Sequence, residues 1–296
     1  MPHYDICLPW YWEYDVDFIH MVEHACGRHD ATLWQVTPDS VLEKITSLYN
    51  GEVSFGTLLD RGQGDQRFEP IHRWARDHNI RRINPPEISE RAENKAAMHL
   101  VLIDNGIYAP YTLLLAPFIE QPLLPDLDLT PLGERIVIKP AFGGGGEGVV
   151  SSASDIQAVL RTRLEFPDQT YLVQSLITAR ELEGRPAWFR VFYVGGQTWP
   201  CWWNPSTHAF AVLSAEEEAR YGLTSLREIT TRIAALCGLV WFSTEIACTD
   251  DGQFVAVDYV NDSIDLRVQS RAADGVPDRI VHEMAEQLVA LAKVTP

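Results

Sequence analysis

Residues 136 to 150 read IVIKPAFGGGGEGVV, and this stretch decides the fold prediction. An apolar strand ends at Lys139 and Pro140, and a run of glycines follows immediately: Gly143, Gly144, Gly145, Gly146 and Gly148. Because glycine has no Cβ, backbone N–H groups in such a run can approach a polyphosphate closely, and Lys139 supplies a positive charge beside it. The stretch therefore predicts a phosphate-binding loop.

Three other interpretations of this loop fit less well. Gly143, Gly145 and Gly148 match G-x-G-x-x-G, but the run VVSS, which begins with two β-branched valines, follows them where a dinucleotide-binding fingerprint needs a helix. A P-loop is excluded because no G-K-[ST] follows the glycines. The third alternative is a plain glycine hairpin between two strands. Lys139 argues against it, because a lysine within a buried strand usually needs a partner.

The stretches on either side of the loop differ in pattern. From residue 4 to 84, short apolar runs alternate with longer amphipathic ones, which indicates β-α-β units on a parallel sheet. Pro85-Pro86 then interrupts regular structure, so we expect domains at 1–86 and 87–296. Beyond a helix expected over 87–105, strand-like runs dominate. Three further helices are expected at 155–164, 224–237 and 278–293. The chain therefore reads as α+β.

Composition limits the classes of function. The 296 residues carry 41 Asp and Glu against 24 Lys and Arg, a formal charge of −17, and 46% are hydrophobic. This acidity argues against binding to nucleic acid or an anionic membrane through a broad basic surface. Five cysteines without a C-x-x-C pair fit reduced thiols. No signal-like or membrane-spanning apolar segment is evident. We therefore expect a cytoplasmic protein.

Two more stretches extend the pattern around the glycine loop: ENKAAMHLVLIDNGIYAPYT at 93–112 and FSTEIACTDDGQFVAVDYVND at 242–262. With the loop, they resemble the ATP-grasp superfamily over roughly residues 87 to 270. Within it they are similar to the carboxylate–amine ligases that include D-alanine ligase and glutathione synthetase. The resemblance implies an ATP-grasp unit whose lobes, about 87–173 and 174–296, clasp ATP, preceded by a small parallel α/β domain.

The resemblance also implies nucleotide-binding residues. Lys139 would contact the α- and β-phosphates under the glycine loop, and Lys95 would be a second lysine facing the nucleotide, although it also reads as a solvated helix charge. The stretch YLVQSLITARE looks like the hinge strand that recognises adenine. Glu181 would accept hydrogen bonds from the ribose, or lie exposed in a loop. The hinge residues are Gln174, Ser175, Leu176 and Ile177, and the first two stand where acidic residues are common in the family.

A metal site is predicted near the end of the chain. Glu245 and Asp258 lie on two strand-like runs joined by the turn DDG, and a hairpin could bring both carboxylates onto one face. Hard oxygen ligands suit Mg²⁺. The resemblance implies Asn261 as an amide ligand and one or two Mg²⁺ ions, with Mn²⁺ as a substitute. Asn261 follows Asp258 by three residues where the family commonly has two. A β-bulge, or Asp262 or Asp265 as a replacement ligand, would account for this.

Two arginines complete the set of expected catalytic residues together with Lys139. Arg190 and Arg267 lie beside the hinge and metal stretches, and a guanidinium suits phosphoryl or carboxylate oxygens. The resemblance implies that they stabilise an acyl phosphate and the transferring group. The alternative for each is a structural ion pair.

Two other patterns have more ordinary explanations. Residues 20 to 24 match the zinc-peptidase pattern H-x-x-E-H, but they fall in the first amphipathic helix of a β-α-β unit, away from the ATP motifs. Trp199, Trp202 and Trp203 could form a flat substrate surface, although tryptophans in strand-like runs usually pack in a core.

The sequence thus predicts an ATP-dependent ligase that joins a small-molecule or peptide carboxylate to an amine, or to a thiol, through an acyl phosphate. Two alternatives stay open: a kinase of the same fold acting on a hydroxyl, and a nucleotide-binding regulatory protein without turnover. The sequence leaves the substrates unidentified. It also leaves open whether the chain forms a homodimer.

Overall fold

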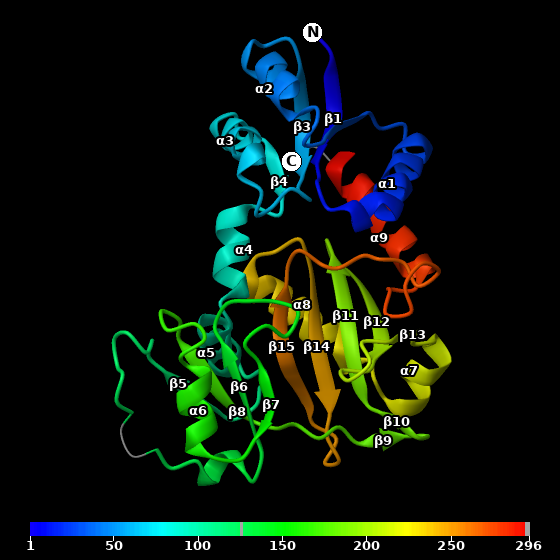
Figure 1. The fold of residues 1–296 in the computed structure, drawn as a ribbon. Coiled ribbons are helices and arrows are strands. Elements are labelled where there is room, and N and C mark those ends of the chain that lie inside the picture. Colours follow the sequence, from blue (N-terminus) through cyan, green and yellow to red (C-terminus); the bar gives the residue numbers. More distant parts are fainter. Residues whose placement is uncertain (125–126, 294–296) are drawn as a thin grey trace.

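A computed structural model describes residues 1–124 and 127–293 of the chain. It consists of an amino-terminal layer with a parallel sheet and, beneath it, two lobes that each contain an antiparallel sheet (Figure 1). The predicted α+β class is confirmed. The domain limits at 1–86 and 87–296 stay a prediction.

The amino-terminal sheet is parallel, with strand order β2-β1-β3-β4. Its strands are β1 (His3–Pro9), β2 (Leu33–Val36), β3 (Ser54–Leu59) and β4 (Arg81–Ile83). The intervening helices are α1 (Val16–Arg28), α2 (Val41–Tyr49) and α3 (Glu69–Asp77). The predicted alternation of strands and helices is therefore confirmed.

The carboxyl-terminal helix α9 (Asp278–Lys293) returns to this layer and packs against α1, β1 and β3. Its apolar face shares a core with Phe18 of α1 and Ile6 of β1. Thr57 of β3 donates a hydrogen bond of 3.1 Å to the carbonyl of Ala292. Burial of this amphipathic helix face ties the end of the chain to its beginning.

The stretch expected as one helix over 87–105 forms two, α4 (Pro86–Glu93) and α5 (Lys95–Asp104). Asn94 breaks the helix because its backbone is extended, with φ −65° and ψ 95°, and its side chain accepts the Ala97 N–H at 3.0 Å. An asparagine N-cap satisfies an otherwise unpaired donor of the new helix. The break places Lys95 on the first turn of α5.

The first antiparallel sheet has strand order β5-β8-β6-β7. Its strands are β5 (Thr112–Leu115), β6 (Ile136–Pro140), β7 (Val150–Ala153) and β8 (Tyr171–Ser175), with helix α6 (Ile156–Thr162) between β7 and β8. The glycine loop joins β6 to β7, as the sequence predicts.

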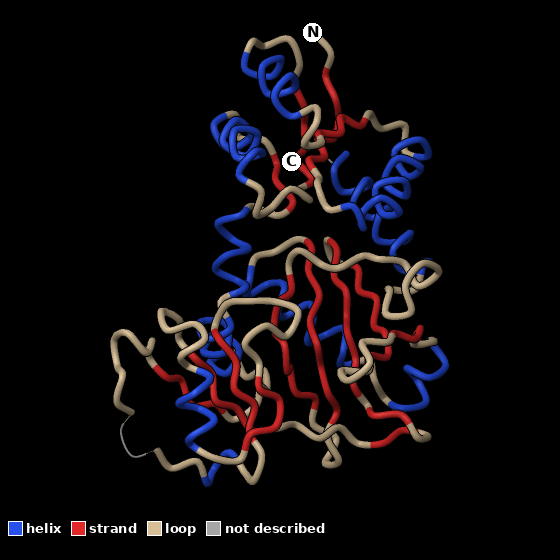
Figure 2. The backbone as a smooth tube through the Cα atoms, viewed as in Figure 1, coloured by secondary structure: helices blue, strands red, loops and turns tan. Residues whose placement is uncertain are grey.

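The second antiparallel sheet, drawn in red to the right of the first in Figure 2, has strand order β13-β12-β11-β14-β15. Its strands are β11 (Trp188–Val194), β12 (Gln197–Trp203), β13 (Phe210–Val212), β14 (Trp241–Cys248) and β15 (Phe254–Asn261). A short hairpin precedes it, formed by β9 (Glu181–Leu182) and β10 (Arg185–Pro186). Helix α8 (Ser225–Cys237) was expected, whereas α7 (Ala215–Tyr221), which begins at a Ser214–Glu217 capping box, was not.

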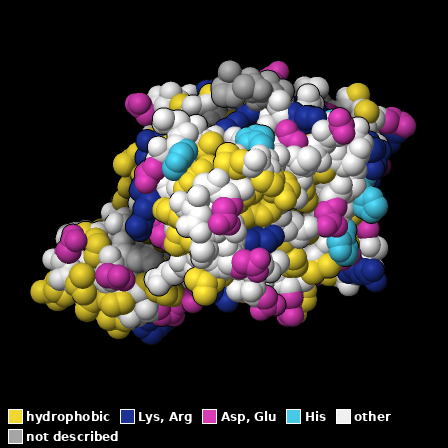
Figure 3. Space-filling view, turned by 90° about the horizontal axis from the view of Figure 1, so that it is seen from above, with side chains coloured by type: hydrophobic (Ala, Val, Ile, Leu, Met, Phe, Trp, Pro, Cys, Tyr) yellow, Lys and Arg dark blue, Asp and Glu magenta, His cyan; other side chains and the backbone are white. Residues whose placement is uncertain are grey.

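Seen from the amino-terminal side, acidic and basic side chains are interspersed among apolar ones (Figure 3). All five cysteines are buried and unpaired. Within residues 1–124 and 127–293, no helix combines the length and the apolar character needed to cross a membrane.

Candidate active site

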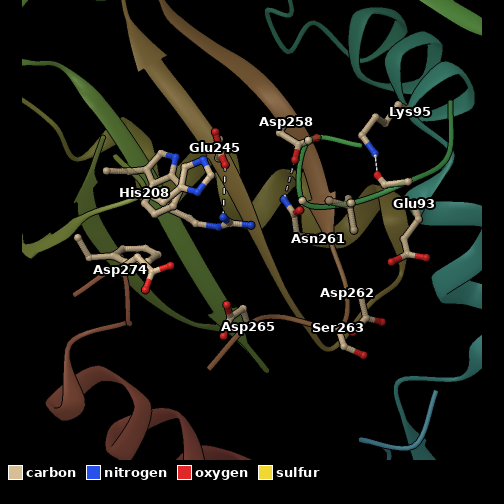
Figure 4. Close-up of a pocket in the computed structure, with 18 of the residues that line it drawn as sticks. Glu93, Lys95, His208, Glu245, Asp258, Asn261, Asp262, Ser263, Asp265 and Asp274 are labelled. Atoms are coloured by element: carbon tan, nitrogen blue, oxygen red, sulfur yellow. Dashed lines mark hydrogen bonds and ion pairs between the residues drawn. The ribbon is translucent and has the colours of Figure 1, made fainter. Parts of the chain in front are cut away.

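A cavity of about 410 Å³ lies where the two lobes meet the loop that follows β15. Figure 4 shows Lys95 and Glu93 on one side, His208 and Asp274 on the other, and Asp258 with Asn261 between them. The remaining lining residues are Gly143, Gly144, Gly145, Gly146, Arg190, Trp203, Phe210, Glu245, Val260, Asp262, Ser263, Asp265 and Arg267. Most residues of the predicted catalytic, phosphate and metal sets thus share one cavity.

The β14–β15 hairpin places the two predicted acidic ligands opposite each other. Glu245 pairs directly with Asp258 across the hairpin, and Ser243 pairs with Asn261. Between these pairs β14 advances two residues while β15 advances three, so β15 contains a β-bulge there. The bulge absorbs the extra residue between Asp258 and Asn261. It brings the Asn261 Nδ2 within 3.0 Å of the Asp258 Oδ2.

The donor set fits a magnesium ion. Asp258 Oδ1 is buried and has no hydrogen-bond partner among the described residues. A buried carboxylate oxygen left in that state is costly unless something else binds it. The described residues contain no group of three or more His, Cys, Asp and Glu side chains placed to hold a metal. Glu245, Asp258 and the Asn261 amide could hold Mg²⁺ only if phosphate oxygens complete its coordination, as they commonly do at nucleotide sites.

The two acids differ in their electrostatic environment. Burial raises the pKa of Glu245, and the negative charge of Asp258 adds to this although Arg190 opposes it. Burial would also raise the pKa of Asp258, but the positive charges of Lys139 and Lys95 hold it below its ordinary value. Asp258 is therefore the more firmly ionised of the pair.

Lys95 connects helix α5 to the glycine loop. Its backbone N–H donates to the Ala141 carbonyl at 2.8 Å, and its Nζ donates to the Gly143 carbonyl at 2.6 Å. The loop glycines Gly143, Gly145 and Gly146 have positive φ, which residues with a Cβ rarely adopt. Lys95 and the loop thus form one wall of the cavity with a positive charge at its surface.

Lys139 lies behind this wall and bridges the two antiparallel sheets. From β6 its Nζ donates to the Val257 carbonyl of β15 at 3.0 Å and lies 5.3 Å from the centre of the Tyr259 ring. The side chain is buried, which lowers the pKa of Lys139, while the Asp258 charge opposes that shift. Lys139 does not line the cavity, so its predicted phosphate contact stays a prediction.

The two arginines lie in the cavity, and both form ion pairs. Arg190 Nε donates to Ser243 Oγ at 3.1 Å, its Nη1 lies 3.4 Å from Glu245, and its guanidinium lies over the Trp203 ring. Arg267 binds Asp265 and Asp274 through two hydrogen bonds or more to each. These bonds to Asp265 and Asp274 raise the pKa of Arg267 further. Both guanidinium groups are thereby held in fixed positions.

The predicted hinge residues do not line this cavity. Gln174 is buried, and its Nε2 donates to Thr112 Oγ1 at 2.8 Å and to the Tyr259 hydroxyl at 3.0 Å. The N–H groups of Ser175 and Leu176 donate to the carbonyls of Tyr111 and Arg135. Ile177 follows them, and Glu181 is exposed on β9. Their roles toward adenine and ribose stay predictions.

The alternative metal ligands, Asp262 and Asp265, form hydrogen bonds and ion pairs with other side chains. Asp262 Oδ2 accepts hydrogen bonds from Ser89 Oγ at 2.6 Å and Asn84 Nδ2 at 3.0 Å, and Asp265 is paired with Arg267. Both acids also line the cavity, so the choice between Asn261 and these replacement ligands stays a prediction.

Several cavity residues were not predicted from the sequence. Trp203 was favoured as a core residue, and it is indeed buried, but it also lines the cavity. Glu93, His208, Phe210 and Asp274 were missed. Burial, with the charge of nearby Asp262, raises the pKa of Glu93 to about 7. The hairpin loop after the aromatic strand could have pointed to His208, since loops at a sheet edge commonly carry site residues.

Comparison with known proteins identifies structures with a similar fold. No protein-family model matches the chain. A D-alanine–D-alanine ligase from Bacillus anthracis complexed with ATP has a TM-score of 0.67 at 14% identity, over 100% of this chain and 99% of that one. The ATP-grasp ligase PsnB, complexed with a minimal precursor, Mg and ADP, has a TM-score of 0.64 at 14% identity, over 98% of each chain.

A curated relative is similar over a shorter stretch. It is a tetrahydromethanopterin:alpha-L-glutamate ligase from Methanocaldococcus jannaschii, 29% identical over 138 residues. The match covers 42% of this chain and 45% of that protein, which is less than half of the relative's length. Together with the structures, it shows that this chain has the ATP-grasp fold, as the glycine loop and the Glu245–Asp258 hairpin predict.

Proposed function

We propose that the protein is an ATP-dependent ligase that joins a carboxylate to an amine and releases ADP and phosphate. The similarity to D-alanine–D-alanine ligase, to the glutamate ligase and to PsnB with its precursor supports a small-molecule or peptide carboxylate as substrate. The proposed cofactor is Mg²⁺, bound with ATP.

One observation carries the proposal. Glu245 and Asp258 are paired across the β14–β15 hairpin, and a bulge brings the Asn261 amide beside Asp258. This donor set faces the same cavity as Lys95 and the glycine loop. Oxygen ligands for Mg²⁺, a cation and a flexible glycine backbone in one cavity are the combination that a nucleoside triphosphate requires.

The arginines suit phosphoryl transfer to a carboxylate. Arg190 and Arg267 project into the cavity beyond the metal ligands and are held by their acidic partners, so they need little reorganisation as charge develops on the transferring group. Bound Mg²⁺ would neutralise phosphate charge. Lys95 would hold the glycine loop over the phosphates through its bond to Gly143. The amine would then attack the acyl phosphate and release phosphate.

The test is nucleotide turnover. ADP and phosphate release from Mg-ATP is measured with a panel of carboxylates, each with and without amines that include D-alanine and L-glutamate. Mass spectrometry of the product distinguishes an amide from a phosphate ester. Asp258→Asn is compared with Asp250→Asn, an identical change at an exposed position in the turn of the same hairpin.

We expect ADP release that depends on both acid and amine, with an amide as product. Loss of charge stabilisation at a transferring phosphoryl group typically costs about 100-fold or more in rate. The rate of ADP release should fall by that factor in Asp258→Asn and should match wild type in Asp250→Asn. A phosphate ester would replace the ligase proposal with the kinase alternative. Mg-ATP binding without turnover on any pair would favour the regulatory alternative.

A further inference from the structure

Amide formation requires a base, and the cavity offers few free ones. An amine is protonated at neutral pH and must lose a proton before its nitrogen can attack a carbonyl carbon. A side chain that accepts this proton must be titratable, must face the cavity and must not already be committed to another group.

Most acidic and basic groups in the cavity are already engaged. Among the described residues, Lys95 is bonded to Gly143, Arg190 to Glu245 and Ser243, and Arg267 to two acids. Each cavity acid also has a partner: Glu93 accepts the Asp262 backbone N–H, and Asp258, Asp262, Asp265, Asp274 and Glu245 are bonded as described above.

His208 is the exception within residues 1–124 and 127–293. It lines the cavity, is exposed, and its ring nitrogens form no hydrogen bond or ion pair. Its ring is stacked on Trp203, with centroids 5.5 Å apart and an angle of 10° between the planes. The guanidinium of Arg190 lies 5.2 Å from the same Trp203 ring. The imidazole and the arginine that is expected to bind the acyl phosphate thus both contact the Trp203 ring in this cavity.

The backbone holds His208 in place. Its φ of 56° lies in the left-handed region, where non-glycine residues are uncommon. The β12–β13 turn that imposes this conformation is fixed by Asn204, whose carbonyl accepts the His208 N–H at 2.8 Å and whose Oδ1 accepts the N–H of Ser206 at 2.9 Å. Such backbone outliers are often found at functional sites.

The charged groups around the imidazole come from three elements. Arg190 on β11 and Glu245 on β14 come from the second antiparallel sheet, and Arg267 and Asp274 come from the loop after β15. Hydrogen bonds from Arg267 chiefly hold the pKa of Asp274 below its ordinary value, and the His208 ring adds to the effect. The imidazole therefore shares the cavity with two guanidinium groups, each of which is paired with a carboxylate.

We propose that His208 is the general base that deprotonates the amine substrate in this cavity. The inference rests on the proposed ligase function. An imidazole nitrogen takes one proton from the ammonium group, and the nitrogen lone pair forms the C–N bond with the acyl carbon. The bond from that carbon to the phosphate oxygen breaks, phosphate leaves with the electron pair, and the second ammonium proton leaves on the phosphate.

The test compares two nucleophiles in His208→Asn. Asparagine, like histidine, tolerates a left-handed backbone, so the turn is preserved while the base is removed. Hydroxylamine is largely unprotonated at neutral pH and attacks an acyl phosphate without a base. Rates are measured from pH 6 to 9 with hydroxylamine and with D-alanine or L-glutamate, whichever wild type uses. His20→Asn, at an exposed position on α1, is the matched control.

With the amino acid, we expect the rate of His208→Asn to fall by about 100-fold or more, which is the usual contribution of a general base. With hydroxylamine, its rate should match that of wild type. The deficit should shrink as the pH rises and the amine deprotonates in solution. Added imidazole should restore part of the rate in His208→Gly, where the ring is missing and positive φ is allowed.

Equal loss with both nucleophiles, or an undiminished rate with the amino acid, would overturn the role of His208 while leaving the ligase function intact. If wild type forms no ADP with any acid, the proposed function fails first and this inference fails with it.

Discussion

Removal of Arg61 should destabilise the protein by about 3–5 kcal/mol, because it leaves a buried carboxylate without its cation. Arg61 follows β3 and Asp15 precedes α1, and their side chains are 3% and 1% exposed. Arg61 Nε donates to Asp15 Oδ2 at 3.0 Å, Nη2 donates to Oδ1, and Nη1 donates to the Ile264 carbonyl at 3.0 Å. This ion pair ties the amino-terminal sheet to the loop that lines the cavity.

The assay is a double-mutant cycle followed by urea unfolding with circular dichroism. Arg61→Met and Asp15→Leu should each destabilise, whereas the double variant should recover at least about 2 kcal/mol, because two apolar side chains can replace a buried ion pair without leaving a charge behind. Burial already raises the pKa of Asp15. In Arg61→Met its folded pKa rises further, so the loss of stability should be largest at alkaline pH and should shrink toward pH 4.

A cost below about 1 kcal/mol for Arg61→Met would place the pair among weak surface contacts and refute this reasoning. A double variant that is no more stable than the less stable of the two single variants would also refute it. A changed slope of unfolding free energy against urea would mean that the transition no longer compares the same two states.

Three further predictions concern other positions. A Cβ on Gly148, at φ +67°, would lie 2.6 Å from the Phe166 ring, so Gly148→Ala should cost about 1–3 kcal/mol of stability. Among the described residues, no atom other than those of its chain neighbours lies within 4 Å of a Cβ added at Gly144. Gly144→Ala should therefore change stability by less than about 0.5 kcal/mol yet weaken ATP binding, measured by calorimetry. Burial raises the pKa of Asp60 to about 6. The folded state therefore favours the protonated acid, and stability falls as the pH rises from about 4 to about 6. The Asp60→Asn variant should lack that fall, and it should be more stable than wild type by up to about 3 kcal/mol at pH 7. A loss at pH 7 would show that the ion pair with His72, 3.4 Å away, outweighs burial.

Much of the fold followed from local patterns. Alternating apolar runs predicted the parallel sheet, and the glycine loop and the DDG hairpin predicted the ATP-grasp fold. These features are readable because strand and helix periods and glycine conformations depend on neighbours in sequence. The helix break at Asn94 was missed because asparagine is tolerated inside a helix as well as at its start.

The sequence by itself determined the stretches that carry the predicted phosphate and metal residues, since Lys95, the glycine run, Glu245 and Asp258 lie in recognisable patterns. Only the tertiary structure decided how they meet. The β15 bulge brings Asn261 to Asp258, Lys95 reaches Gly143 across 48 positions of sequence, and His208 faces the cavity from a hairpin turn. Such contacts depend on strand register and on packing between distant segments, and no local period in the sequence encodes either.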